Sequence, residues 1–406
     1  MKITRLDTLR LAEFPALLWL RVHTDGELVG TGETFFAPGA VASYLHDDVA
    51  PYLLGQDPRD VERHSFRLQN VYVGSRDSGA ETRGNSAIDI ALWDICGQAL
   101  GQPVWRLLGG RTHQRVPVYN TCAGYGHARA STRQALYERT EDWSLAGVAE
   151  GAAEGPYEDL LGFRFHADRL ARSLRDEGIR AMKIWPFDIA AEASNGTRIG
   201  RADLARALEP FRKIRDAVGD DMEIMVELHG LWSLPCAMTI AAALEPFAPA
   251  WIEEPIRFND IGALAHLARH TRIPICASER LATRTSFKHL IAAGAASIVM
   301  LDLAWCGGIT EARKIAAMAE AHSLPVTLHD CTGPITYAAS VALSTVLPNV
   351  NWQEMVRAYT TGWYTEIATA LPAVADGQVG ALDGLGLALR PELFARADAT
   401  LRISTL

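Results

Sequence analysis

Short apolar runs, each ending in one polar residue, recur at regular spacing through the second half of the chain. The residues that end these runs are Lys183, Glu227, Glu253, Glu279, Asp302, His329 and Glu354. From Glu227 onward, 23 to 27 residues separate one from the next, which is enough for one strand, one loop and one helix. Apolar runs of this length are typical of buried parallel strands. The repeat predicts an α/β fold with a (β/α)8-type barrel, whose polar ladder lies at the carboxyl ends of the strands, where such barrels carry their active sites.

The first part of the chain has a different pattern. Residues 1–36 alternate between apolar and polar, with breaks at Phe14-Pro15 and at residues 24–27, which predicts an antiparallel hairpin or meander. Three helical patterns follow between residues 38 and 108. The clearest covers residues 86–99, with Ser86 as the expected N-cap and Gly101 just beyond its end. Strands followed by helices indicate a separate α+β domain.

These patterns divide the chain into three parts. We expect the α+β domain at residues 1–112, the barrel at 113–364 and a C-terminal segment at 365–406 that packs back on the first domain. That last segment has turn signals at Asp376-Gly377 and Asp383-Gly384 and a strand-like run at 385–390. Within the barrel, residues 123–165 form a long, weakly periodic stretch after the first expected strand, 116–121. Its length predicts a lid or a specificity loop over the barrel mouth.

Composition and charge narrow the class of protein. With 406 residues, 49% of them hydrophobic and 21% charged, the chain has room for a barrel of roughly 250 residues and a second domain. The net charge of -9 and the lack of a basic run argue against nucleic acid or an anionic membrane as a partner. The six cysteines lie far apart without metal-finger spacing, so we expect reduced, mostly buried thiols. We find no signal-peptide pattern and expect a cytoplasmic protein.

Three glutamates end successive barrel strands. A single glutamate at a strand end is more often a solvated loop residue or a salt-bridge partner, but Glu227, Glu253 and Glu279 are evenly spaced. Three carboxylates that converge on one mouth would repel each other unless a cation lay between them. Because all the donors are oxygens, with no Cys or His among them, the set favours Mg²⁺ over Zn²⁺.

A histidine and an aspartate end the next two strands after the glutamates. The Asp302 carboxylate can hydrogen-bond one ring nitrogen of His329, which fixes its tautomer and makes the other nitrogen a general base. A lone histidine in an apolar strand is more often a core residue, but His329 stands at the strand end with an acidic partner one strand earlier.

Two further ladder residues and a histidine beside the ladder suggest acid and electrostatic roles. His229 lies two residues beyond Glu227, so strand alternation directs it to the same side, where it could donate a proton; the alternative is a loop histidine with no role. Lys183 could neutralise a substrate carboxylate or developing negative charge, and Glu354 could bond an opposing oxygen.

These residues, in this order, resemble the enolase superfamily and, within it, the mandelate racemase-like subgroup. The motif IDIALWDICGQALGQPVWRLLGG resembles the junction between that family's capping domain and barrel. WIEEP and CASER resemble two of its metal-binding strands, and LDLAWCGGIT with LHDCTGP resembles its Asp-His dyad. The resemblance implies a modified TIM barrel with an N-terminal α+β capping domain completed by the C-terminal tail. It also implies Mg²⁺ held by the three glutamates, a dyad that removes the proton α to a carboxylate, and Glu354 beside the enediolate.

Two departures from the racemase pattern refine this expectation. Racemases of this subgroup carry K-x-K on the second barrel strand, whereas this chain has Lys183 and Trp185 and so lacks the second base. Glu227 followed by His229 resembles the galactonate- and mannonate-type acid-sugar dehydratases, in which that histidine protonates the departing 3-hydroxyl; Glu rather than Asp as first ligand is a lesser difference. We therefore expect a hydro-lyase that converts an aldonate- or aldarate-type acid to a 2-keto-3-deoxy acid. The residues expected to contact substrate are Lys183, Trp185, Tyr125 and His127.

Two alternatives remain open at this point. An epimerase, racemase or cycloisomerase would use the same enediolate and differ only in its fate. A barrel that binds a ligand without catalysis is the other, although the complete ladder argues against it. The expected partners are a small-molecule sugar acid and further copies of this chain.

Overall fold

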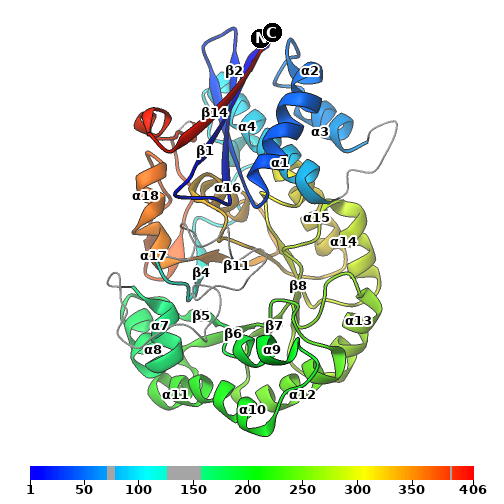
Figure 1. The fold of residues 1–406 in the computed structure, drawn as a ribbon, viewed down its shortest axis with the longest axis vertical. Helices are drawn as coiled ribbons and strands as arrows, with labels where there is room; N and C mark the ends of the chain where they lie inside the picture. Colours follow the sequence, from blue (N-terminus) through cyan, green and yellow to red (C-terminus); the bar gives the residue numbers. More distant parts are fainter. Residues whose placement is uncertain (71–77, 126–156, 385) are drawn as a thin grey trace.

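Both ends of the chain contribute to one antiparallel sheet, in the strand order β14-β1-β2-β3. The computed structural model describes residues 1–70, 78–125, 157–384 and 386–406. The strands of this sheet are β1 (Ile3–Leu11), β2 (Leu17–Thr24), β3 (Val29–Phe35) and β14 (Ala399–Thr405). Because β14 pairs antiparallel with β1 from Arg5 to Leu11, the two termini lie side by side at one end of the molecule (Figure 1). The prediction that the C-terminal tail completes the first domain is confirmed.

Helices cover one side of this sheet and form the rest of the capping domain. They are α1 (Pro38–Ser43), the π-helical turn η1 (Tyr44–Val49), α2 (Ala50–Leu53), α3 (Val61–Gln69), α4 (Gly79–Leu100) and α5 (Val104–Leu107). The long helix α4 lies directly on β3, where a side-chain carbon at Gly30 or Gly32 would come within 2.1 Å of a carbonyl oxygen of α4. Only glycine permits so close an approach of helix to strand.

Helix α4 begins earlier than its sequence pattern predicts. Ser86 is not its N-cap but lies inside the helix, where its hydroxyl donates to the carbonyl of Thr82 (2.7 Å) and accepts from the amide of Gly307 in the barrel (3.0 Å). A serine that bonds back into its own helix gives the same local sequence signal as a cap. The C-terminal end is as predicted, at Gly101 in the left-handed conformation (φ 62°).

Eight parallel strands close into the predicted barrel. They are β4 (Val116–Thr121), β5 (Ala181–Ile184), β6 (Glu223–Glu227), β7 (Trp251–Glu253), β8 (Ile275–Ala277), β9 (Ile298–Leu301), β10 (Val326–Leu328) and β11 (Val350–Met355). Each strand pairs with the next, and β11 returns to pair with β4, which closes the ring. Strands four apart, such as β6 and β10, therefore face each other across the mouth.

The barrel interior explains why the polar ladder gathers at one end. A separate apolar cluster fills the inside with Tyr119, Ala181, Met225, Trp251, Cys276, Ile298 and Met300. Side chains two residues apart on a strand point to the same side. Two positions after members of this layer come Thr121, Lys183, Glu227, Glu253 and Asp302. The polar ladder is thus the next layer of the barrel interior, at the carboxyl ends of the strands.

Helices follow the strands and surround the barrel. They are α7 (Asp159–Phe165), α8 (Ala167–Asp176), α9 (Asp188–Ser194), α10 (Arg201–Ala207), α11 (Glu209–Val218), α12 (Leu234–Leu244), α13 (Ile261–His270), α14 (Thr283–Ala292), α15 (Gly308–Ala321), α16 (Pro334–Ser344), α17 (Arg357–Thr360) and α18 (Trp363–Ile367). Short 3-10 turns η2 (Gly219–Asp221), η3 (Glu245–Phe247) and η4 (Pro391–Ala395) complete the helical elements. Helices α10 and α11 are separate, since Pro210 provides no amide hydrogen to continue the first.

The C-terminal segment differs in one place from the prediction. The turn at Asp376-Gly377 joins β12 (Val374–Ala375) to β13 (Gln378–Val379), and both turn residues have positive φ, as a tight hairpin requires. The strand-like stretch around Leu387 is irregular, with one isolated bridge between Leu389 and Ala368. The strand that completes the capping sheet is β14, further along the chain.

A buried ion-pair network ties the beginning of the barrel to its end. Arg357, after β11, donates two parallel hydrogen bonds to Asp159 of α7 (2.6 and 2.8 Å) and a third to Glu177 (2.8 Å). Its backbone amide donates to Asn120 of β4 (2.9 Å), whose side chain also donates to Asp159 (2.8 Å). Arg357 and Asp159 are both buried. The network therefore fixes β4, α7 and the segment after β11 relative to one another.

We predict that Asp159→Asn destabilises the protein by about 3–5 kcal/mol, because it leaves the Arg357 guanidinium buried without its main counter-charge. The change in the midpoint of unfolding by guanidinium chloride measures this loss of stability. Asp203→Asn is the matched control: it removes an exposed partner of Arg206 on the surface of α10 and should change stability by less than about 0.5 kcal/mol. Equal stability of the two variants would show that the buried pair does not hold the barrel ends together.

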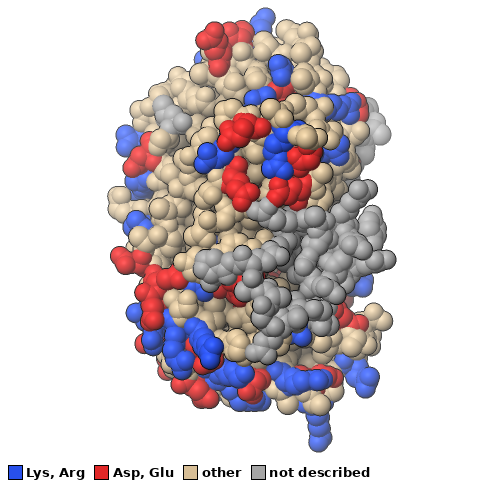
Figure 2. Space-filling view, turned by 60° about the vertical axis from the view of Figure 1, so that its left-hand side comes forward, with Lys and Arg blue, Asp and Glu red and all other residues tan. Residues whose placement is uncertain are grey.

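Three further observations concern the hydropathy of the helices, the charges on the surface and the cysteines. Within the described residues, no helix is long and apolar enough to cross a membrane. Acidic and basic side chains are interspersed on the face shown in Figure 2. All six cysteines are free; five are buried and Cys331 is half-buried.

Candidate active site

Three glutamates from consecutive barrel strands meet at the mouth. Glu227 ends β6, Glu253 ends β7 and Glu279 follows β8; all three are buried. Each offers a carboxylate oxygen, and these oxygens lie within 4.8 Å of one another. Among the described residues, the buried Oε2 of Glu279 has no hydrogen-bond donor. Such a group of oxygens with an unsatisfied member is suited to a metal ion.

Lys183 provides a positive charge in the middle of this group. Its Nζ lies 2.6 Å from Glu253 and 2.9 Å from Glu354, and 3.8 Å from Glu227. Burial opposes the charged form, but the surrounding carboxylates, Glu253 and Glu354 first, hold the pKa of Lys183 well above its usual value. The lysine is therefore a permanent cation on the wall of the site.

The pKa values of the carboxylates reflect their crowding. Burial, and then the charge of Glu279, raise the pKa of Glu227 to about 7, against the effect of Lys183. Burial also holds the pKa of Glu253 well above its usual value. For Glu279 burial acts in the same direction, but the positive charges of His329 and Arg280 outweigh it and lower its pKa to about 2. One lysine does not balance this number of buried acids, so the site favours an additional cation.

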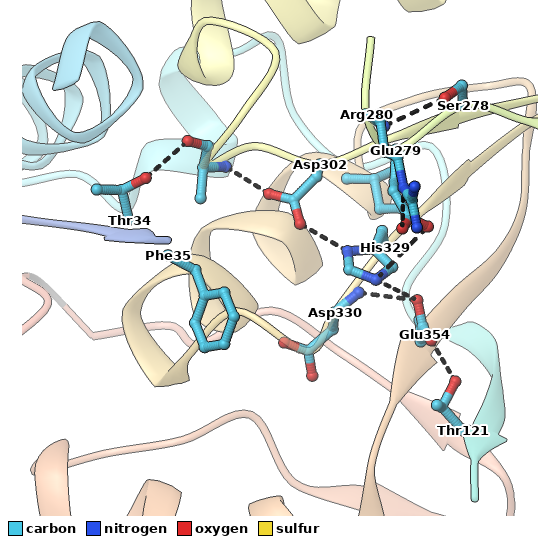
Figure 3. A network of polar contacts seen from close by, with 12 residues as sticks. Thr34, Phe35, Thr121, Ser278, Glu279, Arg280, Asp302, His329, Asp330 and Glu354 are labelled. Carbon is cyan, nitrogen blue, oxygen red and sulfur yellow. Dashed lines mark hydrogen bonds and ion pairs between the residues drawn. The ribbon is translucent and has the colours of Figure 1, made fainter. Parts of the chain in front are cut away.

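His329 and Asp302 form the predicted pair. The Nδ1 of His329 lies 2.6 Å from an Asp302 oxygen, and the other Asp302 oxygen accepts from the amide of Ala304 (2.7 Å) (Figure 3). The free ring nitrogen, Nε2, lies 3.8 Å from both Glu279 and Glu354. Burial acts to lower the pKa of His329, but Glu354, Glu279 and the Asp302 hydrogen bond raise it well above its usual value. The ring is held with Nε2 directed towards the glutamates.

Glu354 is held by groups that the sequence did not indicate. One oxygen bonds the hydroxyl of Thr121 on β4, and the other accepts from the amide of Asp330 (2.9 Å) (Figure 3). Burial acts to raise the pKa of Glu354, but Lys183 and His329 lower it. A buried carboxylate that stays ionised between a lysine and a histidine can orient both.

His229 lies across the mouth from His329, because β6 and β10 are opposite strands of the ring. Its backbone amide donates to Glu227 (2.5 Å), and its φ of 51° is left-handed. Its Nδ1 lies 2.7 Å from the buried carboxylate of Asp188, at the start of α9. Asp188 was not predicted from the sequence. The site thus contains two imidazoles, each with its own carboxylate, on opposite sides of the three glutamates.

The remaining predicted substrate contacts lie in different surroundings. Trp185 is buried against the ring of His229 (centroids 5.8 Å apart) and Phe163. Tyr125 accepts a hydrogen bond from the amide of Tyr157 (3.3 Å), and His127 lies outside the described residues. Most of the predicted lid, 126–156, also lies outside them; its last part is helix α7.

The capping domain forms part of the wall of the mouth. The hydroxyl of Thr34, at the end of β3, donates to the carbonyl of Ala304 (3.0 Å), next to Asp302 (Figure 3). The Glu33 side chain accepts a hydrogen bond from the backbone amide of Thr336, in the first turn of α16 (2.9 Å). The ring of Trp305 lies 5.4 Å from that of His329.

Comparison with known families agrees with this geometry. Residues 12–109 match the N-terminal domain of mandelate racemase / muconate lactonizing enzyme, and residues 166–393 match the enolase C-terminal domain-like family. The chain belongs to the enolase superfamily. Within the superfamily it falls in the mandelate racemase-like subgroup, and it is an enzyme.

Several individual proteins of the superfamily are similar to this chain over most of its length. It is 34% identical to a D-galactonate dehydratase of Ralstonia nicotianae over 87% of this chain and 81% of the relative, and 32% identical to one of Cronobacter sakazakii. Among solved structures, a mandelate racemase subgroup enolase from Agrobacterium tumefaciens is 44% identical, with a TM-score of 0.86 over 100% of this chain and 99% of that one. An enolase protein from Sargasso Sea sequencing is 40% identical, with the same TM-score.

Enolase superfamily members generally bind Mg²⁺, and the part of the chain that the structure describes offers two groups of potential ligands. The three glutamates are one, and His329, Cys331 and Glu354 are the other. The imidazole and thiol of the second group suit Zn²⁺, whereas Mg²⁺ takes oxygen ligands. The all-carboxylate group is therefore the one that fits the superfamily's metal.

Proposed function

We propose that the enzyme is a Mg²⁺-dependent hydro-lyase that dehydrates a sugar acid to a 2-keto-3-deoxy acid. The observation that carries the proposal is the pair of imidazoles, His329 with Asp302 and His229 with Asp188, on opposite sides of one carboxylate group. Dehydration needs a base at C2 and an acid at C3, and two histidines with separate partners can fill both roles. The galactonate dehydratases among the relatives support the same reaction class.

Glu227, Glu253 and Glu279 are the residues that would hold the metal. The set fits Mg²⁺ because every donor is oxygen and one buried oxygen of Glu279 has no other partner among the described residues. When bound there, Mg²⁺ supplies counter-charge for the substrate carboxylate and for the negative charge that grows on it as the α-proton leaves.

His329 removes the proton from C2. Asp302 accepts the Nδ1 hydrogen bond and so orients the ring with Nε2, the nitrogen that acts as the base, towards the substrate. The electrons of the broken C2–H bond move into the carboxylate and give an enediolate. Lys183, a permanent cation beside Glu253 and Glu354, stabilises this added negative charge.

His229 then assists loss of the hydroxyl from C3. A proton passes from its ring to the hydroxyl oxygen, the C3–O bond breaks with its electron pair going to oxygen, and water leaves. The enediolate electrons form the C2–C3 double bond, and the resulting enol becomes the 2-keto acid. The Asp188 carboxylate, 2.7 Å from Nδ1, fixes the orientation of the ring.

The test is a screen of aldonates and aldarates for 2-keto-3-deoxy product, with Mg²⁺ and with EDTA. The proposal expects product from at least one acid sugar, dependent on the metal. If a substrate instead exchanges or epimerises at C2 in D2O without forming keto acid, the enzyme is an epimerase using the same first step. Turnover that is unchanged in EDTA would contradict the metal assignment.

Metal binding should also stabilise the fold. Mg²⁺ at a hundred times its Kd adds about 2.7 kcal/mol of stability, because it binds only the folded site. Melting temperature with Mg²⁺ and with EDTA measures this. Glu253→Gln should abolish the shift, whereas Glu62→Gln, which changes an exposed partner of Lys314 in the capping domain, should preserve it. An undiminished shift in Glu253→Gln would place the metal elsewhere.

A further inference from the structure

One arginine of the capping domain, Arg83, reaches the mouth of the barrel. Arg83 lies near the start of α4 and is partly buried. Its Nη1 donates to the carbonyl of Phe35 (2.6 Å), and its guanidinium lies 4.5 Å from the centre of the Trp305 ring. Within residues 1–70, 78–125, 157–384 and 386–406, no carboxylate makes an ion pair with it. A guanidinium has five N–H donors, and with the described residues Arg83 makes one hydrogen bond.

Two other arginines of this chain pair with a buried carboxylate. Arg357 bonds Asp159, and Arg284 bonds the buried Glu311 (2.5 Å). Burial lowers the pKa of Arg83 to about 10, with Asp302 opposing that effect, so it stays charged at neutral pH. A charge held in a partly buried position without a partner is unfavourable unless a ligand completes it.

The side chain of Trp305 lies near both Arg83 and the catalytic histidine, His329. The centre of the Trp305 ring lies 4.5 Å from the guanidinium carbon of Arg83 and 5.4 Å from the centre of the His329 ring. Arg280, after β8, adds a second arginine near Arg83, and its Nε lies 3.7 Å from Glu279. Trp305 is thus a neighbour of both groups, and a carbon chain that starts at C2, beside His329, and passes Trp305 leads towards Arg83.

We propose that Arg83 binds a second carboxylate at the far end of the substrate, so that the enzyme is selective for aldarates, which are diacids, over aldonates, which end in a neutral hydroxymethyl group. This inference rests on the proposed function, because it takes C2 of a sugar acid to lie at His329. The planar fork of a guanidinium matches a carboxylate through two parallel hydrogen bonds, which a hydroxyl cannot accept equally. The Trp305 ring provides an apolar surface for the intervening carbons.

The test compares matched pairs of acids by calorimetric titration in Mg²⁺: galactarate with galactonate, glucarate with gluconate, and mannarate with mannonate. Within each pair only the terminal group differs. Wild type should bind at least one diacid tenfold or more tightly than its aldonate. Arg83→Gln should weaken the binding of that diacid by roughly thirtyfold or more, because it removes one partner of a buried charge pair. The affinity for the aldonate should change by less than threefold.

Arg63→Gln is the matched control, since it removes an equal charge from an exposed ion pair with Asp60 in the same domain; it should leave both affinities unchanged. Equal binding of diacid and aldonate by wild type, no binding of any pair, or equal weakening of both by Arg83→Gln would overturn the proposal. Keto-acid formation is followed on the same samples. Selective diacid binding without keto product would refute the dehydratase proposal alone, whereas dehydration without preference for diacids would refute the Arg83 assignment alone.

Discussion

His329→Asn should abolish both exchange of the C2 proton and formation of keto acid, while leaving the fold and Mg²⁺ binding intact. Asparagine can still bond Asp302, but it has no basic nitrogen to accept the proton. The loss should be at least the hundred- to ten-thousandfold that general base catalysis contributes. Keto-acid formation and deuterium incorporation at C2 measure the two steps, and the melting shift with Mg²⁺ measures the metal site.

Two results would contradict this role. Proton exchange that survives in His329→Asn would mean that another group is the base, and loss of the Mg²⁺ shift together with activity would give His329 a structural or metal-binding role. Asp302→Asn is a graded companion: the base remains but its orientation is no longer fixed, so activity should fall less than in His329→Asn.

His229→Asn should lower the rate of keto-acid formation by about a hundred- to ten-thousandfold, because the departing hydroxyl loses its acid. The fold should be retained, since the backbone amide that bonds Glu227 is unchanged. Steady-state kcat for keto product is the measurement. His270→Asn, at an exposed position at the end of α13, is the control and should keep full activity. Unchanged kcat in His229→Asn would mean that the hydroxyl leaves by another donor.

The barrel and most of its ladder could be predicted because both follow from local periodicity. Alternation along a strand places a residue on the same side as the one two positions before it, and so Glu227, Glu253 and Lys183 follow inward-facing core residues. Glu279 is different, because β8 ends at Ala277 and alternation no longer applies beyond a strand end. Its place beside the other glutamates comes from the even spacing of the repeat.

Residues that support the site from other elements could not be predicted in this way. Asp188 reaches His229 from a helix after a different strand, and Thr121 reaches Glu354 across the closure of the barrel. Arg83 comes from another domain. These contacts depend on how distant elements pack together, and no spacing along the chain records them.

The two errors of local prediction have a similar origin. Ser86 has the chemistry of a helix cap, but it lies inside α4 and bonds the barrel at Gly307. The run around Leu387 alternates like a strand, yet the edge of the sheet, along β1, is already paired with β14. In both cases, contacts with a distant part of the chain determined the local structure.

The central claim, that one histidine removes the C2 proton and a different one on the opposite strand releases the hydroxyl, is tested most directly by proton NMR of His229→Asn with substrate and Mg²⁺ in D2O. The account predicts that the C2 signal disappears as deuterium is incorporated, at a rate near that of wild-type exchange, while keto product scarcely forms. If exchange and dehydration fall together in this variant, His229 acts in metal or substrate binding and the division of roles between the two histidines is wrong.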